Sequence, residues 1–268
     1  MSLSDVGVRL LSPAPMEILF LGTSSGWPLP RLGCKCDICT SPDPKDIRLR
    51  PSILVNEQIL VDASYDIYHQ LKKYNVDISK LTHILLTHAH DDHIMGLYDL
   101  SHVYAGPRIT LISTPEVISS ARRKLSTSIL SFRVFEAKPL EKVRLAKDWT
   151  CSFIPVEHSV PCYALKLKAP KVVTYAPEFR RIIPSSRKRI AGSEVIIIDG
   201  SSKTSVGQAH GHETIEEGIR LGRKIGVKKI FFTNIGHKTD RHGALTDFVK
   251  DVGGSKFNIA FDGLEINV

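Results

Sequence analysis

Long apolar runs are missing from this sequence of 268 residues. No stretch approaches the ~20 apolar residues that a membrane-spanning helix needs, which excludes a helical membrane protein. The opening residues, MSLSDVGVRLLSPAP, also lack a basic start followed by an apolar stretch. We therefore expect no secretory signal and a cytoplasmic location. Internal repeats and low-complexity tracts are absent as well, so the sequence indicates an ordinary globular chain.

Cysteine is scarce and unevenly placed, with five residues in the chain. Cys34, Cys36 and Cys39 crowd into the motif CKCDIC, while Cys151 and Cys162 stand alone. An odd number of cysteines in a chain without a secretory signal favours a metal site over disulfides. Three reduced cysteines without a metal are the alternative. Cys151 and Cys162 fit core positions, because one lies within a strand pattern and the other just before one.

Acidic residues are outnumbered, with 28 Asp and Glu against 36 Lys and Arg, for a net charge of +8. This excess favours an anionic substrate or partner, although general solubility explains it equally well. Nucleic acid binding would rest on charge alone, because no RNA-recognition signature with interleaved aromatic residues is present. The length suits one large domain or two small ones, and it allows burial of roughly 75% of the unfolded surface.

Short apolar runs bounded by turn residues alternate with helical patterns. They predict strands at 16–22, 52–56, 58–63, 83–88, 108–113, 151–156, 163–168, 171–176, 194–199, 229–234 and 257–263. Apolar residues at three- and four-residue spacing predict helices at 66–74, 115–125, 212–226 and 244–252. Many strands with helices in both halves predict an α/β fold in which two sheets are covered by helices, an αββα sandwich. Residues 22–46 and the basic stretch 177–193 are predicted to be irregular, functional loops.

Histidine is concentrated directly after the strand predicted at 83–88. The motif HAHDDH places His88, His90, Asp92 and His93 within six residues. Imidazole nitrogens and carboxylate oxygens are ligands for zinc, manganese or iron. A solvated polar turn is the alternative, but the pattern should arise by chance on the order of once in a thousand such chains. The motif therefore predicts a metal centre whose alternate residues point at two ions.

The motif His-x-His-x-Asp-His after a strand resembles the signature of the metallo-β-lactamase superfamily. The resemblance extends along nearly the whole chain, so it implies a single domain over residues 1–268 with two mixed β-sheets flanked by helices. VDAS, which contains Asp62, resembles the acidic turn before the motif. In VEHS, His158 stands at a strand end and matches the third ligand of the first metal ion.

Further motifs resemble one subgroup of that superfamily. GHET, which contains His212, and the closing FDGLEI fit it, as does the cysteine loop after a Gly-rich strand end. This subgroup contains the cyclic phosphodiesterase of the carbon–phosphorus lyase pathway and the B protein of pyrroloquinoline quinone biosynthesis. Ribonuclease Z is a more distant relative without the cysteine loop. The resemblance implies that a histidine completes a structural zinc site with the three cysteines. Its offset leads to His237, with His242 as the alternative fourth ligand.

Two positions depart from the complete two-metal pattern. Ala176 stands where a bridging aspartate is expected, with Glu178 as the nearest acid, and Asn234 stands where the last ligand histidine is expected. The first site keeps His88, His90 and His158, whereas the second keeps only Asp92 and His93. We therefore expect the first site to fill first and the second to be weakly occupied or empty.

The resemblance implies a metal-dependent hydrolase that acts on a small anionic phosphodiester, cyclic ones included. It needs one or two catalytic ions of zinc, manganese or iron, besides one structural zinc ion. Asp92 would orient or deprotonate the attacking water. His212 would protonate the leaving oxygen or bind a phosphate oxygen, unless it is a capping or surface histidine. Asp199 is expected to orient a ligand histidine, or else to replace the missing aspartate.

Alternative functions remain open on the sequence. An oxidoreductase like the quinone-biosynthesis protein would use iron or zinc at the same histidines, and an RNA-processing nuclease would resemble ribonuclease Z. Arginine and lysine side chains after the strand predicted at 171–176 suit phosphate oxygens if they reach the metal rim, or belong to a solvated loop: Arg180, Arg181, Arg187, Lys188 and Arg189. The sequence leaves the oligomeric state open, a homodimer included.

Overall fold

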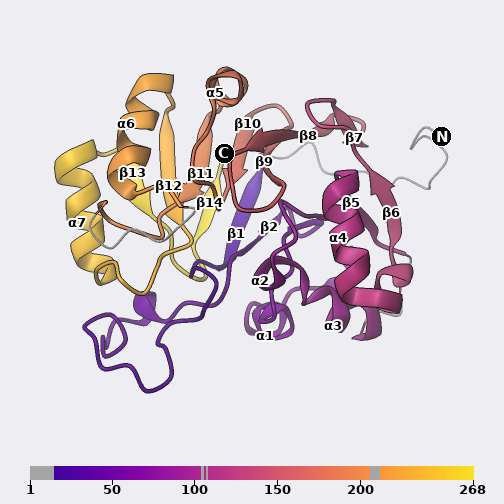
Figure 1. The fold of residues 1–268 in the computed structure, drawn as a ribbon, viewed down its shortest axis with the longest axis horizontal. Coiled ribbons are helices and arrows are strands. Elements are labelled where there is room, and N and C mark those ends of the chain that lie inside the picture. Colours follow the sequence, from indigo (N-terminus) through magenta and orange to yellow (C-terminus); the bar gives the residue numbers. More distant parts are fainter. Residues whose placement is uncertain (1–14, 104–105, 107, 206–211) are drawn as a thin grey trace.

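Two β-sheets face each other in the computed structural model, which describes residues 15–103, 106, 108–205 and 212–268 (Figure 1). The first sheet runs in the spatial order β14 (Glu265–Asn267), β1 (Glu17–Gly22), β2 (Ser52–Val55), β3 (Ile59–Val61), β4 (His83–Leu85), β5 (Thr110–Ser113) and β6 (Arg133–Glu136). The second runs in the order β13 (Phe257–Ile259), β12 (Lys229–Thr233), β11 (Val195–Asp199), β10 (Val172–Ala176), β9 (Cys162–Lys168), β8 (Trp149–Val156) and β7 (Val143–Ala146).

Both sheets are mixed. Strands β3, β4, β5 and β6 are parallel, whereas β14, β1, β2 and β3 pair antiparallel. In the second sheet, β10, β11, β12 and β13 are parallel, whereas β7, β8, β9 and β10 pair antiparallel. This arrangement confirms the predicted sandwich of two mixed sheets flanked by helices.

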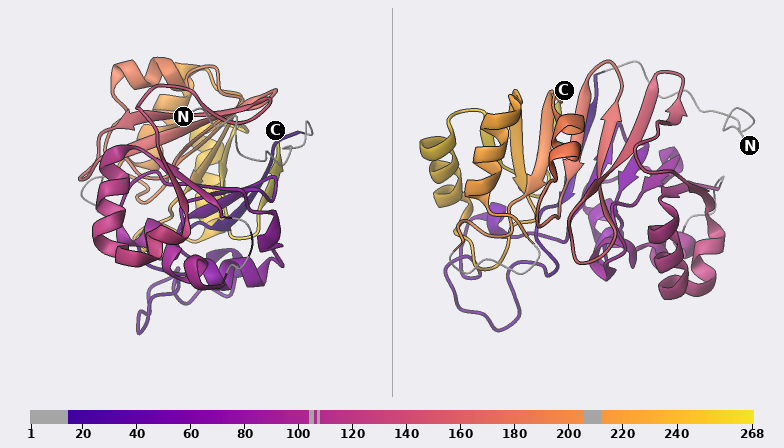
Figure 2. Two further views of the ribbon diagram at one scale, coloured as in Figure 1. Left: turned by 90° about the vertical axis from the view of Figure 1, so that its right-hand side faces the viewer. Right: turned by 45° about the horizontal axis from the view of Figure 1, so that its top comes forward.

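Helices cover the outer sides of the sandwich (Figures 1 and 2). Beside the first sheet lie α1 (Ile67–Lys73), α2 (Asp91–Ile94), α3 (Leu97–Val103) and α4 (Pro115–Leu125). Beside the second lie α5 (Pro184–Ile190), α6 (Ile215–Ile225) and α7 (His242–Gly253). Short 3₁₀ helices occupy Pro44–Asp46, Ile78–Lys80 and Ser126–Ser131. None of the helices in the described residues is long and apolar enough to cross a membrane.

The central strands of the second sheet are buried on both faces. In β11, Val195 and Ile197 belong to the core between the sheets, while Ile196 and Ile198 belong to the core under the helices. A helix-covered parallel sheet needs such a continuous apolar run rather than alternation. The run VIIID therefore makes a buried strand, and the polar residues that follow it emerge at the edge of the sheet.

The prediction of an irregular loop at 177–193 was wrong for part of that segment. Residues Pro184–Ile190 form α5, in which Pro184 takes the first helical turn and basic residues fill the last. The strands β6, β7 and β14 were not predicted. All three are short and lie at the edges of their sheets, and β6 and β14 leave several side chains exposed. Edge strands of this kind carry little apolar signal.

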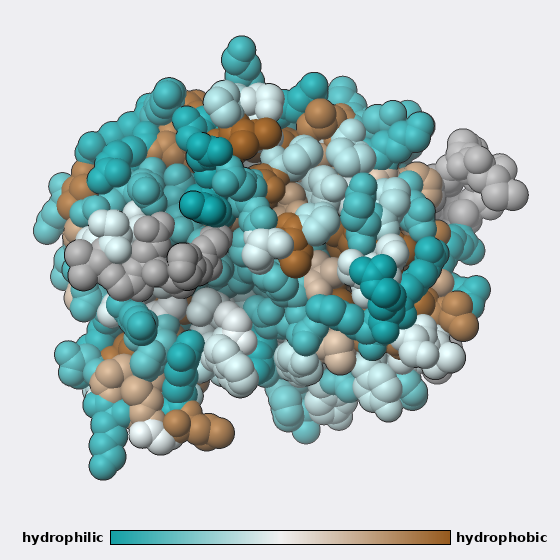
Figure 3. Space-filling view, in the orientation of Figure 1, coloured by the Kyte–Doolittle hydropathy of each residue, from teal (hydrophilic) through white to brown (hydrophobic). Residues whose placement is uncertain are grey.

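Apolar residues are scattered over the face of the molecule seen in Figure 3, which is otherwise mostly hydrophilic. The apolar side chains of the sequence are instead concentrated in the two cores. Their burial supplies the main driving force for this fold.

Gly96 lies between α2 and α3, just after the HAHDDH motif, and packs against the loop after β3. Its amide donates to the Ala63 carbonyl, and a Cβ there would lie 2.0 Å from the Ser64 carbonyl oxygen. We expect Gly96→Ala to destabilise the fold by at least about 1–3 kcal/mol, because two backbone segments must separate. Gly243→Ala is the matched control. A Cβ meets nothing within 4 Å there, so this helical position should gain up to ~1 kcal/mol. Equal melting temperatures for the two variants would contradict this close packing.

Candidate metal centre

The first histidine of the motif is held by a buried acidic turn. Asp62 follows β3 at a φ of 58°, and its carboxylate accepts from the Thr87 amide (2.8 Å) and the Thr87 hydroxyl (2.8 Å). Because that hydroxyl donates to Asp62, it accepts from Nδ1 of His88 at 2.9 Å. The Nε2 atom of His88 is thereby left with a free lone pair.

Three histidines converge at this point. Nε2 of His88 lies 3.1 Å from Nδ1 of His90, and Nε2 of His158 lies 3.3 Å from the same atom. His88 is fully buried, and His158 reaches the cluster from the end of β8. The antiparallel bridge between His88 and Cys162 fixes the motif against the second sheet. Three imidazole nitrogens facing one point form the ligand set of an open catalytic zinc site.

Glu178, the acid nearest to the expected position of the bridging aspartate, lies between the two groups of ligating side chains. Its Oε2 lies 3.2 Å from Nε2 of His88 and 3.3 Å from Nε2 of His158, while its Oε1 lies 3.3 Å from Nε2 of His93. The chain leaves β10 at Ala176 and continues past Pro177, so the side chain two residues further on reaches between the clusters. Ala176 packs in the core under the helices instead.

A second cluster lies on the other side of this carboxylate and contains Asp92, His93 and Glu178. Nδ1 of His93 donates to Asp62 at 2.8 Å, so its Nε2 faces the centre and lies 3.6 Å from Asp92 Oδ2. Asp62 thus orients histidines in both clusters. The sequence indicated Asp62 as part of a family-like turn, but not this double role.

Asn234 completes the surroundings of the second cluster. It follows β12 at a φ of 61°, and its amide nitrogen donates to Oε1 of Glu178 at 3.2 Å. Within the described residues, its Oδ1 and the Nε2 of His93 are buried and have no hydrogen-bond partner. Such atoms are uncommon in native proteins and require an explanation.

Burial and neighbouring charges shift the pKa values of the side chains in the centre. Burial and the neighbouring His93 lower the pKa of His88 to about 4. Burial also opposes ionisation of Glu178, but His93 and the hydrogen-bonding histidines hold the pKa of that carboxyl well below its usual range. His88 is therefore a neutral imidazole beside an ionised carboxylate, the protonation states that metal binding requires. Burial lowers the pKa of His93, but Asp62, Glu178 and Asp92 outweigh it and raise that pKa well above its usual value. A cation at the second cluster would therefore have to displace the Nε2 proton of His93.

His212 stands beside the three-histidine cluster, with its ring 5.7 Å from that of His158. Its Nδ1 donates to Asp199 Oδ2 at 2.7 Å, so Asp199 orients His212 rather than a ligand histidine or a metal ion. Burial favours the neutral ring, but the charge and hydrogen bond of Asp199 outweigh it and raise the pKa of His212 to about 9. His210 of the same loop lies outside the described residues.

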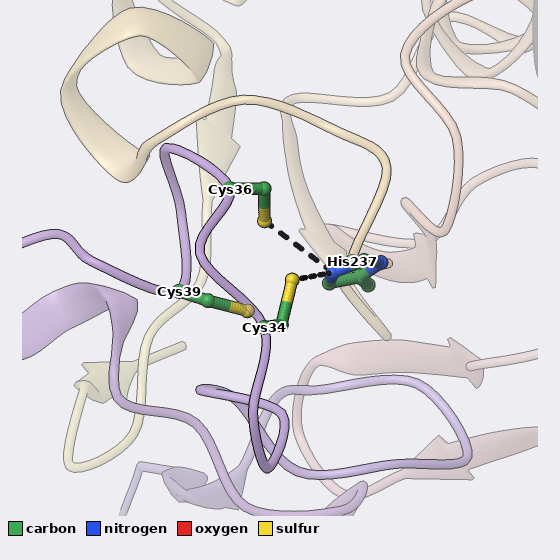
Figure 4. Close-up of side chains that lie close together, drawn as sticks. All are labelled: Cys34, Cys36, Cys39 and His237. Atoms are coloured by element: carbon green, nitrogen blue, oxygen red, sulfur yellow. Dashed lines mark hydrogen bonds between the residues drawn. The ribbon is translucent and has the colours of Figure 1, made fainter.

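The cysteine motif and His237 come together at a separate place (Figure 4). Nε2 of His237 lies 3.0 Å from Sγ of Cys34 and 3.3 Å from Sγ of Cys36, and Cys39 points into the same group. Hydrogen bonds from the Cys36 backbone and from His237 lower the pKa of Cys34 to about 6. Three thiols and one imidazole are the donor set of a closed tetrahedral zinc site.

His242, the alternative fourth ligand, lies elsewhere. Its Nδ1 is 3.1 Å from the buried guanidinium of Arg48, and its amide donates to Asp46 at 2.7 Å. Cys151 and Cys162 are buried in the cores, and Cys162 contacts the Glu178 carbonyl.

Three of the basic residues after β10, Arg180, Arg181 and Arg187, line a groove of ≈ 470 Å³ between that segment and α6, whereas Lys188 and Arg189 are exposed and do not line it. Within the described residues, no member of either histidine cluster lines this groove. The lining residues are Glu157, Arg180, Arg181, Arg187, Glu213, Glu217, Arg220, Leu221 and Lys224.

Relatives of this chain are found among curated proteins. Coenzyme PQQ synthesis protein B of Methylobacterium radiotolerans is 25% identical over 308 residues, which cover 94% of this chain and all of that protein. Octanoyltransferase of Porphyromonas gingivalis is 25% identical over 265 residues, 93% of this chain but 51% of that protein. The chain thus spans about half the length of this second relative.

A solved structure described as a new diphosphatase from the PhnP family shares the fold, with a TM-score of 0.83 and 24% identity over 94% of this chain and 98% of that one. Residues 57–235, more than half of the chain, match the family described as a Beta-lactamase superfamily domain. The resemblance that the HAHDDH motif indicated is therefore confirmed, and the chain belongs to the β-lactamase superfamily.

Proposed function

We propose that this chain is a metal-dependent phosphodiesterase with a centre for two cations. The observation that carries the proposal is the Glu178 carboxylate, which lies between two clusters of metal-ligating side chains. His88, His90, His158 and Glu178 would hold the first ion. Asp92, His93 and Glu178 would hold the second, together with the amide oxygen of Asn234.

Two buried atoms of the second cluster fit a cation. The Nε2 of His93 and the Oδ1 of Asn234 are buried and, within the described residues, lack a hydrogen-bond partner. The amide oxygen of Asn234 carries a lone pair, as the Nε2 of His93 does once its proton is displaced, and both residues contact the Oε1 atom of Glu178. A cation at this point would satisfy both. We therefore replace the expectation of a weak second site with that of a site completed by Glu178.

Bound cations would lower the pKa of a coordinated water to near neutrality and neutralise charge that develops on phosphate oxygens. Asp92 has a half-buried carboxylate at this centre and would orient the attacking water. His212 would donate a proton from Nε2 to the leaving oxygen, because Asp199 holds its Nδ1 proton and supports the imidazolium form. Asp199 acts as its positioning residue.

A structural zinc ion would occupy the cluster of Cys34, Cys36, Cys39 and His237. The donor set fits this ion, because three thiolates and an imidazole fill four tetrahedral positions and leave none for substrate. The role of this ion is to hold the loop of residues 22–46 against the segment after β12.

A second candidate function is a step in quinone cofactor synthesis. The likeness to coenzyme PQQ synthesis protein B over the full length of that protein favours it. This alternative would use the same histidines without phosphate chemistry. Lack of turnover on any phosphodiester by protein loaded with Zn²⁺ or Mn²⁺ would favour it over the leading proposal.

Hydrolysis of bis-p-nitrophenyl phosphate tests the proposed function directly. His90→Ala should abolish metal-dependent turnover, because it removes a ligand. His212→Ala should keep its metal content and lose about 10²–10⁴-fold in kcat, the usual contribution of general acid catalysis. His69→Ala, an exposed histidine on α1, is the matched control and should retain wild-type rates. A full rate in His212→Ala would remove that residue from the mechanism.

Metal titration tests the bridging role of Glu178. Glu178→Gln keeps the shape but removes the shared negative charge, so affinity for the second ion should fall by about 10–100-fold or more. Glu157→Gln serves as the control, because this carboxylate pairs with Arg181 outside the centre. Two equally tight ions at the histidine centre of Glu178→Gln, seen by anomalous scattering, would rule out a bridge at this residue.

Zinc content tests the cysteine cluster. Cys36→Ser should lose one zinc ion per chain and lower the melting temperature, because structural zinc binding is coupled to folding. Each kcal/mol lost should shift Tm by roughly 2–4 °C in a chain of this size. Lys35→Ser alters the exposed neighbouring position and should change neither quantity. Unchanged zinc content and melting temperature in Cys36→Ser would argue against a metal there.

A further inference from the structure

Two aromatic rings stand exposed close to the metal centre. Trp27 follows β1 in the cysteine-containing loop and is 63% exposed, and Tyr65 follows the acidic turn of Asp62 and is 47% exposed. Trp149 is 1% exposed in the core, so Trp27 is the one exposed tryptophan of the two in the sequence. Exposed rings of this size forgo the burial that usually stabilises them.

The Arg50 guanidinium packs against both rings. Its guanidinium carbon lies 5.7 Å from the Trp27 ring centre and 5.1 Å from that of Tyr65, within the range of a cation–π contact. The guanidinium is itself fixed, because Nε donates to the Gly26 carbonyl at 3.0 Å and Nη1 pairs with Asp66 at 3.0 Å. Asp66 balances the charge of Arg50, so this place offers aromatic surface rather than a free cation.

Gly26, the residue before Trp27, lies next to the second metal cluster. A Cβ on Gly26 would lie 3.2 Å from Oδ2 of Asp92, so the residue before Trp27 packs directly on a proposed metal ligand. Trp27 follows Gly26 directly, so the backbone that carries its ring lies next to the proposed second metal site. The contact with Arg50 also lowers the entropic cost of stacking a ligand on that ring.

We propose that Trp27, supported by Arg50 and Tyr65, stacks the base of a nucleoside carried by the substrate phosphodiester. This proposal rests on the proposed phosphodiesterase activity and narrows its substrate class to nucleotide-containing esters. A nucleobase fits this site, because its flat, uncharged face can stack on the exposed Trp27 ring. Such stacking does not require a free positive charge on the protein. The ring would give little discrimination between bases, since stacking tolerates any of them.

Two diesters with the same p-nitrophenolate leaving group distinguish the effect of the base from the effect of the hydrolytic step. One carries thymidine 5′-linked to the phosphate, and the other carries a methyl group. In Trp27→Ala the ratio of kcat/KM for the thymidine ester over the methyl ester should fall roughly 5–150-fold, the usual loss of one stacking contact. Trp27→Phe should keep most of the ratio, and Tyr98→Ala, which removes another exposed ring, should keep all of it.

Equilibrium dialysis with labelled thymidine 5′-monophosphate tests the same ring without turnover. Affinity should fall by a similar factor in Trp27→Ala and largely survive in Trp27→Phe. If binding follows this pattern while no phosphodiester is hydrolysed, the stacking site stands and the proposed function fails. If hydrolysis proceeds while neither the kcat/KM ratio nor nucleotide affinity responds to Trp27→Ala, or if the nucleotide does not bind, the stacking proposal is overturned.

Discussion

The buried carboxylate of Glu178 is the constraint around which this structure is arranged. An ionised group without water is costly to bury unless opposite charge and hydrogen bonds surround it. Glu178 meets imidazole nitrogens of His88, His90, His158 and His93, which come from the loop after β4 and from the end of β8. The two sheets must therefore lie in one fixed position relative to each other at this edge. Metal ions would replace much of this direct contact, with the carboxylate shared between them.

A second buried carboxylate decides which nitrogen atoms face the centre. Asp62 accepts from His93 directly and from His88 through the Thr87 hydroxyl, so both rings present Nε2 inward. The unusual φ of 58° at Asp62 is maintained by this network and by the amide of Thr87. Asp199 does the same for His212 on the opposite side. Asp62 thus orients two histidine rings and Asp199 one before any ligand arrives.

Local signals in the sequence were sufficient for part of this centre. The HAHDDH motif lies on one short segment after a strand, so its ligands could be predicted from spacing alone. His158 and His237 lie far along the chain and were placed through resemblance, and the structure brings both to the predicted clusters. Glu178 could not be placed in the same way, because its role depends on the path of the chain through Pro177. Asp199 was expected to orient a ligand histidine or to replace the missing aspartate, whereas it pairs with His212, whose position depends on the fold of a distant segment.

The cysteine cluster and the histidine centre are joined by very little backbone. His237 lies three residues after Asn234, and between them the Ile235 amide donates to Thr23 at 2.7 Å while the Ile235 carbonyl accepts from Ser25 at 3.1 Å. Gly26, which packs on Asp92, follows directly in that first loop. An ion held by the cysteines would therefore fix the loop that carries Gly26 and Trp27 and the segment that carries Asn234. The two hydrogen-bonded backbone segments thus connect the cysteine cluster to the second cluster. If the cysteine loop became mobile, the residues on one side of the metal centre would become mobile as well.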